Sequence, residues 1–371
     1  MCSVIQRVIV LNKKKKTSSM TTPALPPCIG LLPAGKNNLI TDVSGLKVGH
    51  STVSDGIHQT GVTVITPHSG NLFCDKVPAA ATVLNGFGKS VGLVQVEELG
   101  VLETPIALTN TFSVGAMAQA QIRQSINENP EVGRAWSTVN PLVFECNDGY
   151  LNDIQAMILN DSHYAAALGA ADTQFTQGAV GAGRGMSCFE LKGGIGSASR
   201  VATLATGQTY TVGALVLSNF GRLPTFTLAG KHLGTLLKER LEQRPLTEEK
   251  GSIIMIVATD APLDSRQLRR LSLRAGVGLS RTGAFFGNGS GDISLAFSTA
   301  YTLPQQTDRP MPSVAFLHDA LMDPLFQATA DSVEQAIIHA LWHATTTEGR
   351  DGHRRVSLRD LAPDLQNLLV S

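Results

Sequence analysis

The chain has 371 residues, of which 43% are hydrophobic and 16% are charged, and it contains 36 glycines. This length accommodates one large or two ordinary domains, and the composition is typical of a soluble protein that mixes helices and strands. Lysine plus arginine and aspartate plus glutamate both number 30, so the net charge is zero and nothing favours nucleic acid as a partner.

The cysteines are five in number: Cys2, Cys28, Cys74, Cys146 and Cys188. An odd count without C-x-x-C spacing argues against a disulfide framework and against a structural zinc site. Free cysteines favour a reducing compartment, so we expect a cytoplasmic protein. No apolar run approaches the ~20 residues needed to span a membrane, so no membrane partner is expected.

Residues 1–35 are rich in lysine and proline and are predicted to be a poorly ordered extension. Apolar residues 8–11 precede lysines 13–16, whereas a secretory signal has its basic residues first, and Met20 is an alternative start. Residues 36–371 contain no repeat or linker and are predicted to form a single domain.

Strand patterns follow at residues 39–43, 46–50 and 62–65. Residues 88–92 then fit G-x-S-x-G, the nucleophile elbow of α/β-hydrolases, which requires a strand, a turn and a helix. Because residues 91–96 have the pattern of another strand, we discount Ser90 as a nucleophile. The same glycines resemble the end of a phosphate loop, but Val83 stands where that motif needs glycine.

A helix is predicted over residues 113–129, and a short strand at 141–144 leads into an acid- and amide-rich block, 145–153. Two glycine-rich stretches, 178–185 and 192–196, favour close backbone packing over phosphate binding because neither has a nucleotide-binding spacing. A strand at 210–217 ends in Ser218 and Asn219, and an amphipathic helix is predicted over 229–241.

A charged loop, 243–250, enters an apolar run rich in β-branched residues, 253–257. Such a run predicts a strand that is buried on both faces. Gly251 and Ser252 therefore lie where an exposed loop meets the core. Ser252 is either an ordinary first residue of a strand or a nucleophile that a chain cut makes a new N-terminus.

Asp264 is predicted to cap a helix that ends near Gly276 and Gly278. A glycine-rich turn, 287–292, precedes a strand at 293–297, and the last long helix is predicted to start near Asp331. His339 and His343 have the i, i+4 spacing of some zinc sites. No H-E-x-x-H glutamate lies between them, so surface or core histidines are favoured and no metal is expected.

One constellation needs no histidine: Ser252 at the loop–strand junction, Ser290 and Asp292 in the glycine-rich turn, Asn219 at a strand end, and Tyr150 with Glu145. A serine hydroxyl is a weak nucleophile and needs a base. Cleavage before Ser252 frees its α-amino group, whose reference pKa of roughly 7.7–8.0 leaves part of it unprotonated near pH 7. That amine then acts as the base, directly or through Ser290. Before the cut, glycine at 251 leaves its carbonyl open to the Ser252 hydroxyl.

The chain resembles the self-processing aminopeptidases, which include the L-aminopeptidase/D-esterases and the β-peptidyl aminopeptidases. The resemblance covers roughly residues 30–365 and is carried by blocks at 37–50, 109–115, 145–153, 192–200, 218–221, 251–260 and 288–292. It implies an α+β fold in the form of a four-layer αββα sandwich, like the N-terminal-nucleophile hydrolases, with the topology of the ornithine acetyltransferases. It also implies a cut into chains 1–251 and 252–371, a tetramer of such heterodimers and no cofactor.

The implied reaction releases an N-terminal residue from a short peptide, amide or ester through an acyl-enzyme. By resemblance, Ser252 is the nucleophile, Asn219 stabilises the oxyanion, and Ser290 and Asp292 form a relay in which some members carry glutamate at the second position. Tyr150 matches a tyrosine near the nucleophile. Glu145 matches the acid that receives the substrate ammonium.

Each of these residues also has an ordinary structural role open to it, such as an ion pair for Glu145, a turn cap for Asn219 or core packing for Tyr150. An acyltransferase of the ornithine acetyltransferase type on the same fold is the alternative, although those enzymes and the related nylon-oligomer hydrolases usually have threonine at the position of Ser252. A binding-only relative that stays uncut is the third possibility.

Overall fold

The computed structural model describes residues 25–241 and 251–370. The predicted charged loop 243–250 and the first 24 residues of the predicted extension lie outside these ranges. Within the extension, residues 25–35 pass alongside helix α6 (Asp323–Trp342). Ile29 is 4% exposed, and its N–H donates to Gln335 Oε1 of α6 at 2.7 Å. Arg200 donates to the Ile29 carbonyl at 2.6 Å, so both backbone polar groups of Ile29 tie this segment to the rest of the fold.

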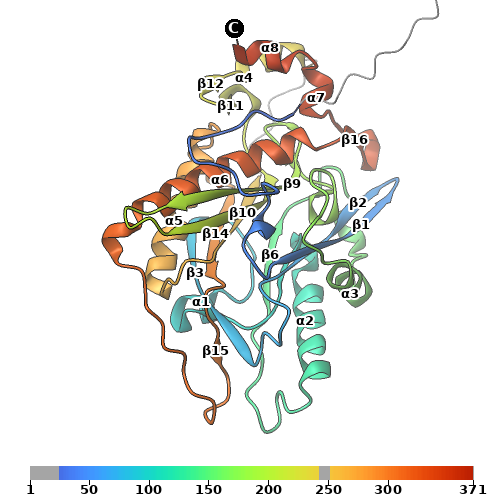
Figure 1. The fold of residues 1–371 in the computed structure, drawn as a ribbon. Helices are drawn as coiled ribbons and strands as arrows, with labels where there is room; N and C mark the ends of the chain where they lie inside the picture. Colours follow the sequence, from blue (N-terminus) through green and yellow to red (C-terminus); the bar gives the residue numbers. More distant parts are fainter. Residues whose placement is uncertain (1–24, 242–250, 371) are drawn as a thin grey trace, which may run out of the picture.

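The described strands form two main sheets (Figure 1). The smaller has the order β1 (Lys47–Asp55), β2 (His58–Thr66), β5 (Ile106–Asn110) and β6 (Leu142–Cys146). The larger has the order β15 (Leu303–Pro304), β3 (Asp75–Gly86), β14 (Gly291–Ser298), β13 (Ser252–Thr259), β10 (Thr209–Asn219) and β9 (Gly194–Thr203), with β4 (Val101–Leu102) beside β3. Three short pairs complete the strands: β7 (Ser187–Cys188) with β8 (Leu191–Lys192), β11 (Thr227–Leu228) with β12 (Lys231–His232), and β16 (Thr347–Glu348) with β17 (Arg354–Arg355).

Helices cover both sheets. Helices α5 (Ser265–Arg281) and α6 pack on the larger sheet, and α2 (Val114–Glu128) and α3 (Asp161–Gly169) pack on the smaller one (Figure 1). The remaining helices are α1 (Leu93–Leu99), α4 (Gly234–Arg240), α7 (Leu358–Leu361) and α8 (Leu365–Val370). The last three gather with β11 and β12 at the top of Figure 1.

The apolar core alternates with the strand pleat. In β13, Ile253, Met255 and Val257 belong to the cluster between the larger sheet and its helices. Ile254 and Ile256 belong instead to a cluster shared by the two sheets. Because successive side chains of a strand point to opposite faces, β13 is buried on both, as its sequence predicted. A third cluster lies between the smaller sheet and helices α2 and α3.

Several predicted elements are confirmed: the helix at 113–129 is α2, and the strands at 46–50, 62–65, 141–144, 210–217 and 293–297 overlap β1, β2, β6, β10 and β14. The strand predicted at 39–43 is wrong. Residues Ile40–Asp42 form a 3-10 turn, because the Asp42 carboxylate accepts the N–H groups of Asn37 and Leu39 at 3.0 and 3.2 Å. Such local bonds compete with strand pairing.

The strand predicted at 91–96 is also wrong, because α1 begins at Leu93. Gly92 with φ 99° and Gly100 with φ 67° bracket this helix in left-handed conformations that favour glycine. The chain therefore runs from β3 through a turn into a helix. This is the context that a nucleophile elbow requires and that the sequence had led us to reject.

Two further helix boundaries differ from prediction. Helix α5 continues through Gly276 and Gly278 to Arg281. A Cβ at Gly278 would lie 2.4 Å from the Ala330 carbonyl oxygen, so this glycine allows α5 and α6 to approach rather than ending α5. Helix α6 starts at Asp323, where a proline occupies its first turn, instead of near Asp331. The helix predicted over 229–241 is limited to α4, because β11 and β12 precede it.

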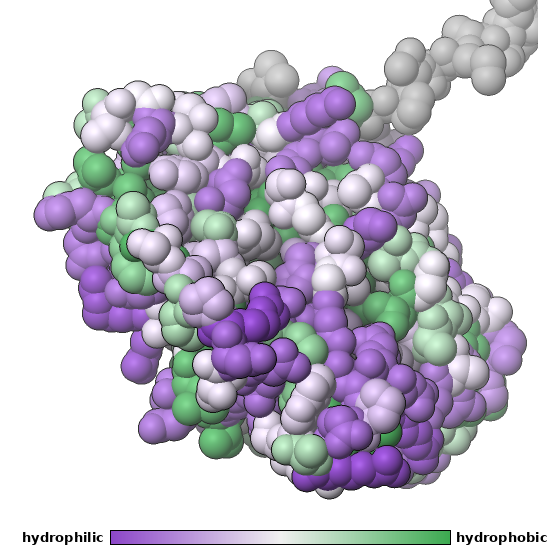
Figure 2. Space-filling view, turned by 60° about the horizontal axis from the view of Figure 1, so that its bottom comes forward, coloured by the Kyte–Doolittle hydropathy of each residue, from purple (hydrophilic) through white to green (hydrophobic). Residues whose placement is uncertain are grey.

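One face of the surface is mixed in polarity. The face in Figure 2, which is the lower side of Figure 1, intersperses hydrophilic and hydrophobic residues. Within the described ranges, no helix combines the length and the apolar character that crossing a membrane requires.

Candidate active site

Ser252 lies where three strands of the larger sheet meet. It is the first residue of β13 and pairs with Asn219, the last residue of β10. On its other side it pairs with Gly291, the first residue of the parallel strand β14. The Gly291 N–H donates to Ser252 Oγ at 3.0 Å, and the serine is 6% exposed. The backbone therefore fixes the position of this hydroxyl.

Gly251 lies tightly against the neighbouring strand end. A Cβ built on it would be 2.3 Å from the Asn219 carbonyl oxygen and 2.5 Å from Phe220 Cα. Sheet pairing holds the Asn219 backbone, and the Phe220 carbonyl accepts the Phe189 N–H at 2.7 Å, so these atoms cannot move aside cheaply. Only glycine fits at the residue before Ser252.

Ser290 and Asp292 flank Gly291. Ser290 Oγ donates to Asp292 Oδ1 at 2.6 Å, and both side chains are buried. The shorter aspartate thus reaches the serine without the extra methylene of a glutamate. The pairing of β14 with β3 shifts register directly after Asp292, and such irregularities commonly re-aim side chains next to functional sites. Asn85 of β3 donates to the Gly287 carbonyl at 3.0 Å and also bonds the Ser290 carbonyl, which holds the turn in place.

The Asn219 side chain is oriented by two hydrogen bonds. Its Oδ1 accepts the Ser187 N–H at 2.8 Å, and its Nδ2 donates to the Asn147 carbonyl at 3.0 Å. A carboxamide nitrogen carries two N–H groups, and within the described residues only one of them is hydrogen-bonded, which leaves the other for a ligand. The amide is therefore oriented in advance as a donor next to Ser252.

A buried lysine supports this amide. Lys192 donates to the carbonyls of Gly183, Met186 and Gly193 at 3.0, 2.8 and 2.8 Å, which uses all three of its donors. Burial lowers the pKa of its amine well below the usual value. The Met186 carbonyl and the Ser187 N–H belong to the same peptide unit, so Lys192 fixes the peptide that orients Asn219. In the sequence, Lys192 stood out only as the first residue of a glycine-rich stretch and of one block that carries the family resemblance, and its supporting role was missed.

Glu145 faces the same cavity as Ser252. This cavity of about 630 Å³ is lined by both residues together with Thr111, Asn147 and Arg222, among others. Glu145 is 2% exposed. Its Oε1 accepts the Lys89 N–H at 2.9 Å, and its Oε2 accepts the Thr111 hydroxyl. The carboxylate is thus held in place by two neutral donors, without a basic side chain bonded to it in the described part of the chain.

Tyr150 is not among the described residues that line this cavity. Its ring stacks on His353 with centroids 4.5 Å apart, and the Arg355 guanidinium carbon lies 3.7 Å from the ring centroid. Arg355 Nε in turn donates to Ser187 Oγ at 3.0 Å. Since the Ser187 N–H holds Asn219, these contacts connect Tyr150 to the amide donor through Arg355 and Ser187.

The other candidate nucleophile lacks a base. Although Ser90 lies between a strand and a helix, its Oγ is buried without a hydrogen-bond partner among the described residues. The expected core role fits His339, whose Nδ1 contacts the Ser197 carbonyl at 2.7 Å and whose pKa burial lowers to about 4. Among residues 25–241 and 251–370, no group of three His, Cys, Asp or Glu side chains is arranged to hold a metal ion, so His343 belongs to no such group.

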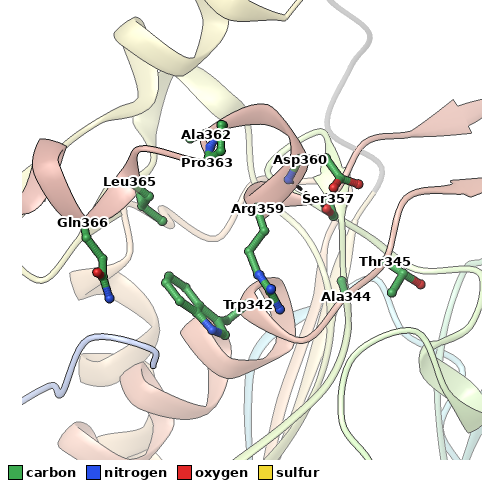
Figure 3. A pocket seen from close by; sticks show the side chains of 10 residues that line it. All are labelled: Trp342, Ala344, Thr345, Ser357, Arg359, Asp360, Ala362, Pro363, Leu365 and Gln366. Carbon is green, nitrogen blue, oxygen red and sulfur yellow. Dashed lines mark hydrogen bonds between the residues drawn. The ribbon is translucent and has the colours of Figure 1, made fainter. Parts of the chain in front are cut away.

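A second cavity, of about 390 Å³, lies beside the C-terminal end of α6 (Figure 3). Its described lining comes entirely from residues 342–366. Trp342 lies on α6 and Arg359 lies on α7. Ser357 Oγ there accepts the Asp360 N–H at 3.1 Å and caps α7. This cavity is separate in sequence and position from the strand ends that carry Ser252.

Comparison with known proteins identifies the family. Residues 38–355 match peptidase family S58. The beta-peptidyl aminopeptidase BapA of Sphingosinicella xenopeptidilytica is 36% identical over 339 residues, which are 85% of this chain and 83% of that protein. The chain belongs to peptidase family S58. The members that it matches include aminopeptidases from several organisms, and this chain is a hydrolase of the same aminopeptidase class.

Solved structures support the same assignment. The PH0078 protein from Pyrococcus horikoshii OT3 is 48% identical, with a TM-score of 0.87 over 92% of this chain and 96% of that one. A beta-aminopeptidase from Burkholderia sp. is 39% identical, with a TM-score of 0.83 over 92% and 96%. The L-aminopeptidase D-Ala-esterase/amidase from Ochrobactrum anthropi is 32% identical, with a TM-score of 0.82 over 92% and 98%, and is described as a variant of the Ntn hydrolase fold. The S58 chain described here is a mixed α and β protein of that kind.

Proposed function

We propose that this S58 protein cuts its own chain between Gly251 and Ser252 and then uses Ser252 as the nucleophile of an aminopeptidase. One observation carries the proposal: Ser252 and the carboxylate of Glu145 line the same cavity. A nucleophile and an anionic site for an ammonium group are the two parts that removal of an N-terminal residue needs.

The cut starts from the hydroxyl of Ser252. Its Oγ attacks the Gly251 carbonyl, the C–N bond breaks, and the hydroxyl proton passes to the departing nitrogen. Water then hydrolyses the resulting ester, which leaves a carboxylate on Gly251 and a free α-amine on Ser252. Because Gly251 has no side chain, this junction can lie directly against the Asn219 backbone.

Turnover repeats the same chemistry on a substrate. The α-amine of Ser252 removes the hydroxyl proton directly or through Ser290, which Asp292 orients with its 2.6 Å hydrogen bond. Oγ attacks the scissile carbonyl while the free N–H of Asn219 stabilises the oxyanion. The leaving amine or alcohol takes the proton, and water hydrolyses the acyl-enzyme. Tyr150, through Arg355 and Ser187, keeps the amide donor in position.

The two product chains, 1–251 and 252–371, remain associated in this proposal. Strand β13 of the second chain pairs with β10 of the first, and β14 pairs with β3. We propose that the full arrangement is a four-layer αββα sandwich with the topology of the ornithine acetyltransferases. Core clusters on both sides of each sheet support it. A single domain over 36–371 is part of the same proposal.

We also propose a cytoplasmic tetramer of processed heterodimers that needs no cofactor. The free state of Cys28, Cys74, Cys146 and Cys188 supports a reducing compartment. The substrates are short peptides, amides or esters with a free N-terminal amine, in line with the names of the relatives. A serine at position 252 rather than threonine argues against an acyltransferase.

The direct test is the Ser252→Ala variant, assayed for chain cleavage and for hydrolysis of an aminoacyl p-nitroanilide. We expect neither activity, because alanine lacks the hydroxyl that attacks the Gly251 carbonyl and the substrate. The Ser137→Ala variant, on an exposed loop, is the matched control and should behave like the parent protein. A Ser252→Ala protein that still cleaves itself or the anilide removes Ser252 from the proposed role.

A further inference from the structure

Arg222 is a cation in the active-site cavity that lacks an anionic partner in the described part of the chain. It lines the cavity together with Ser252 and Glu145. Its side chain is half-buried, and its Nε has no hydrogen-bond partner among the described residues. Likewise, none of the ion pairs between described residues involves this guanidinium. A buried donor without an acceptor is costly, so an anion bound here would be favourable.

The backbone holds Arg222 in a defined position. Its carbonyl accepts the Thr225 N–H at 3.1 Å and the Thr225 hydroxyl at 3.0 Å. The preceding Gly221 has φ 87°, and a Cβ there would lie 2.6 Å from the Phe189 ring. These contacts hold the backbone at Arg222 in place, which fixes the point from which its side chain reaches the cavity.

Arg222 and Glu145 approach Ser252 from different strands. Cys146, the residue after Glu145, donates from Sγ to the Ser252 carbonyl at 3.3 Å. Asn219, three positions before Arg222, pairs with Ser252 in the larger sheet. Ser252 thus contacts both the strand that carries the anionic group and the strand that leads to the cationic one.

We propose that Arg222 binds a carboxylate of the substrate on the leaving-group side of the scissile bond. This inference rests on the proposed function, in which Glu145 receives the substrate ammonium. A short peptide then spans the cavity with its amine on Glu145, its first amide at Ser252 and a carboxylate on Arg222. Guanidinium groups suit this task because they bind carboxylates in a planar, two-pronged geometry. Lys89, also in the cavity, adds a second positive charge.

The carboxylate has two chemical sources in a peptide: the free C-terminus of a dipeptide or an acidic side chain in the second residue. Three substrates with the same N-terminal residue Xaa separate them: Xaa-Ala, Xaa-Ala-amide and Xaa-Glu-amide. We expect kcat/KM to be higher for Xaa-Ala than for Xaa-Ala-amide. Xaa-Glu-amide should match Xaa-Ala only if a side-chain carboxylate serves Arg222 as well as the C-terminal carboxylate does.

The decisive readout is a ratio. In Arg222→Gln, the ratio of kcat/KM for the better carboxylate substrate to that for Xaa-Ala-amide should fall about 10- to 100-fold, the size of a charge-assisted contact. Arg222→Lys should recover part of that ratio. Arg134→Gln, which removes an exposed arginine outside the cavity lining, should leave it unchanged.

Another carboxylate of the protein itself competes for this role. The proposed cut creates one on Gly251, which lies against Asn219 and Phe220. If that group occupies Arg222, Arg222→Gln lowers kcat/KM for all three substrates by the same factor, and the inference is wrong. If the parent protein hydrolyses none of the three, nor a neutral anilide, the proposed function itself fails.

Discussion

Replacing Glu145 with glutamine tests the ammonium site with little change of shape. The carboxylate accepts one backbone N–H, from Lys89, and one hydroxyl, from Thr111. A glutamine oxygen can accept the Lys89 N–H, while its NH2 group donates to the Thr111 hydroxyl, which can rotate to accept. The fold and the self-cleavage should therefore survive, and the variant removes chiefly one buried negative charge.

The expected loss follows from that charge. A hydrogen bond to a charged group contributes about 1.5–3 kcal/mol, which corresponds to an about 10- to 150-fold fall in kcat/KM for a substrate with a free amine. The assay compares an aminoacyl ester with the ester of the same acid without the amino group. For the second ester, the parent and Glu145→Gln proteins should differ by no more than about threefold. Equal losses on both esters would mean that Glu145 supports the structure and binds no ammonium.

Three further variants test Gly251, Asp292 and Asp148, an aspartate that is fully buried just after β6. Gly251→Ala forces a Cβ to 2.3 Å from a backbone carbonyl oxygen and should slow self-cleavage at least about tenfold, as followed on an SDS gel. Gly115→Ala, where the Cβ enters open space, is the control and should cleave at the parent rate. Equal rates for the two variants would contradict the steric argument. Asp292→Asn removes the charge that orients Ser290 and should lower kcat by a factor on the order of 100, measured on processed protein; an unchanged kcat would exclude the relay. Burial raises the pKa of Asp148 from 3.8 to about 6, so the folded state holds a proton that the unfolded state releases, and the stability from this group falls as the pH rises from about 4 to about 6. Urea denaturation of the parent and of Asp148→Asn should show the parent losing about 3 kcal/mol relative to the variant across that interval, and a constant difference would refute the shift.

The strands were predictable where local pattern decides them. The run from Ile253 to Val257 is apolar throughout and rich in β-branched residues, which favours a strand that is buried on both faces. The segments at 39–43 and 91–96 were not predictable in this way. There, an Asp42 carboxylate and two left-handed glycines override propensity, and both effects depend on backbone geometry rather than on hydrophobicity.

The site was predictable only as a set of strand-end residues. Ser252, Asn219 and Gly291 adjoin because β13 pairs with both β10 and β14, which the sequence does not state. Supporting residues were missed for the same reason. Lys192 acts through a peptide carbonyl. Asn85 bonds the carbonyl of Ser290, which lies 205 positions further along the chain. Contacts of this kind leave no local pattern.

The central claim is that the Gly251–Ser252 bond is cut by the protein itself. Intact mass of the freshly purified protein, measured under denaturing conditions, tests it most directly. We predict two fragments that correspond to residues 1–251 and 252–371, with Ser252 as the first residue of the second, and one uncut chain for Ser252→Ala. A parent protein that remains a single chain and still hydrolyses aminoacyl amides would contradict the account, because Ser252 would then have no free α-amine to act as its base.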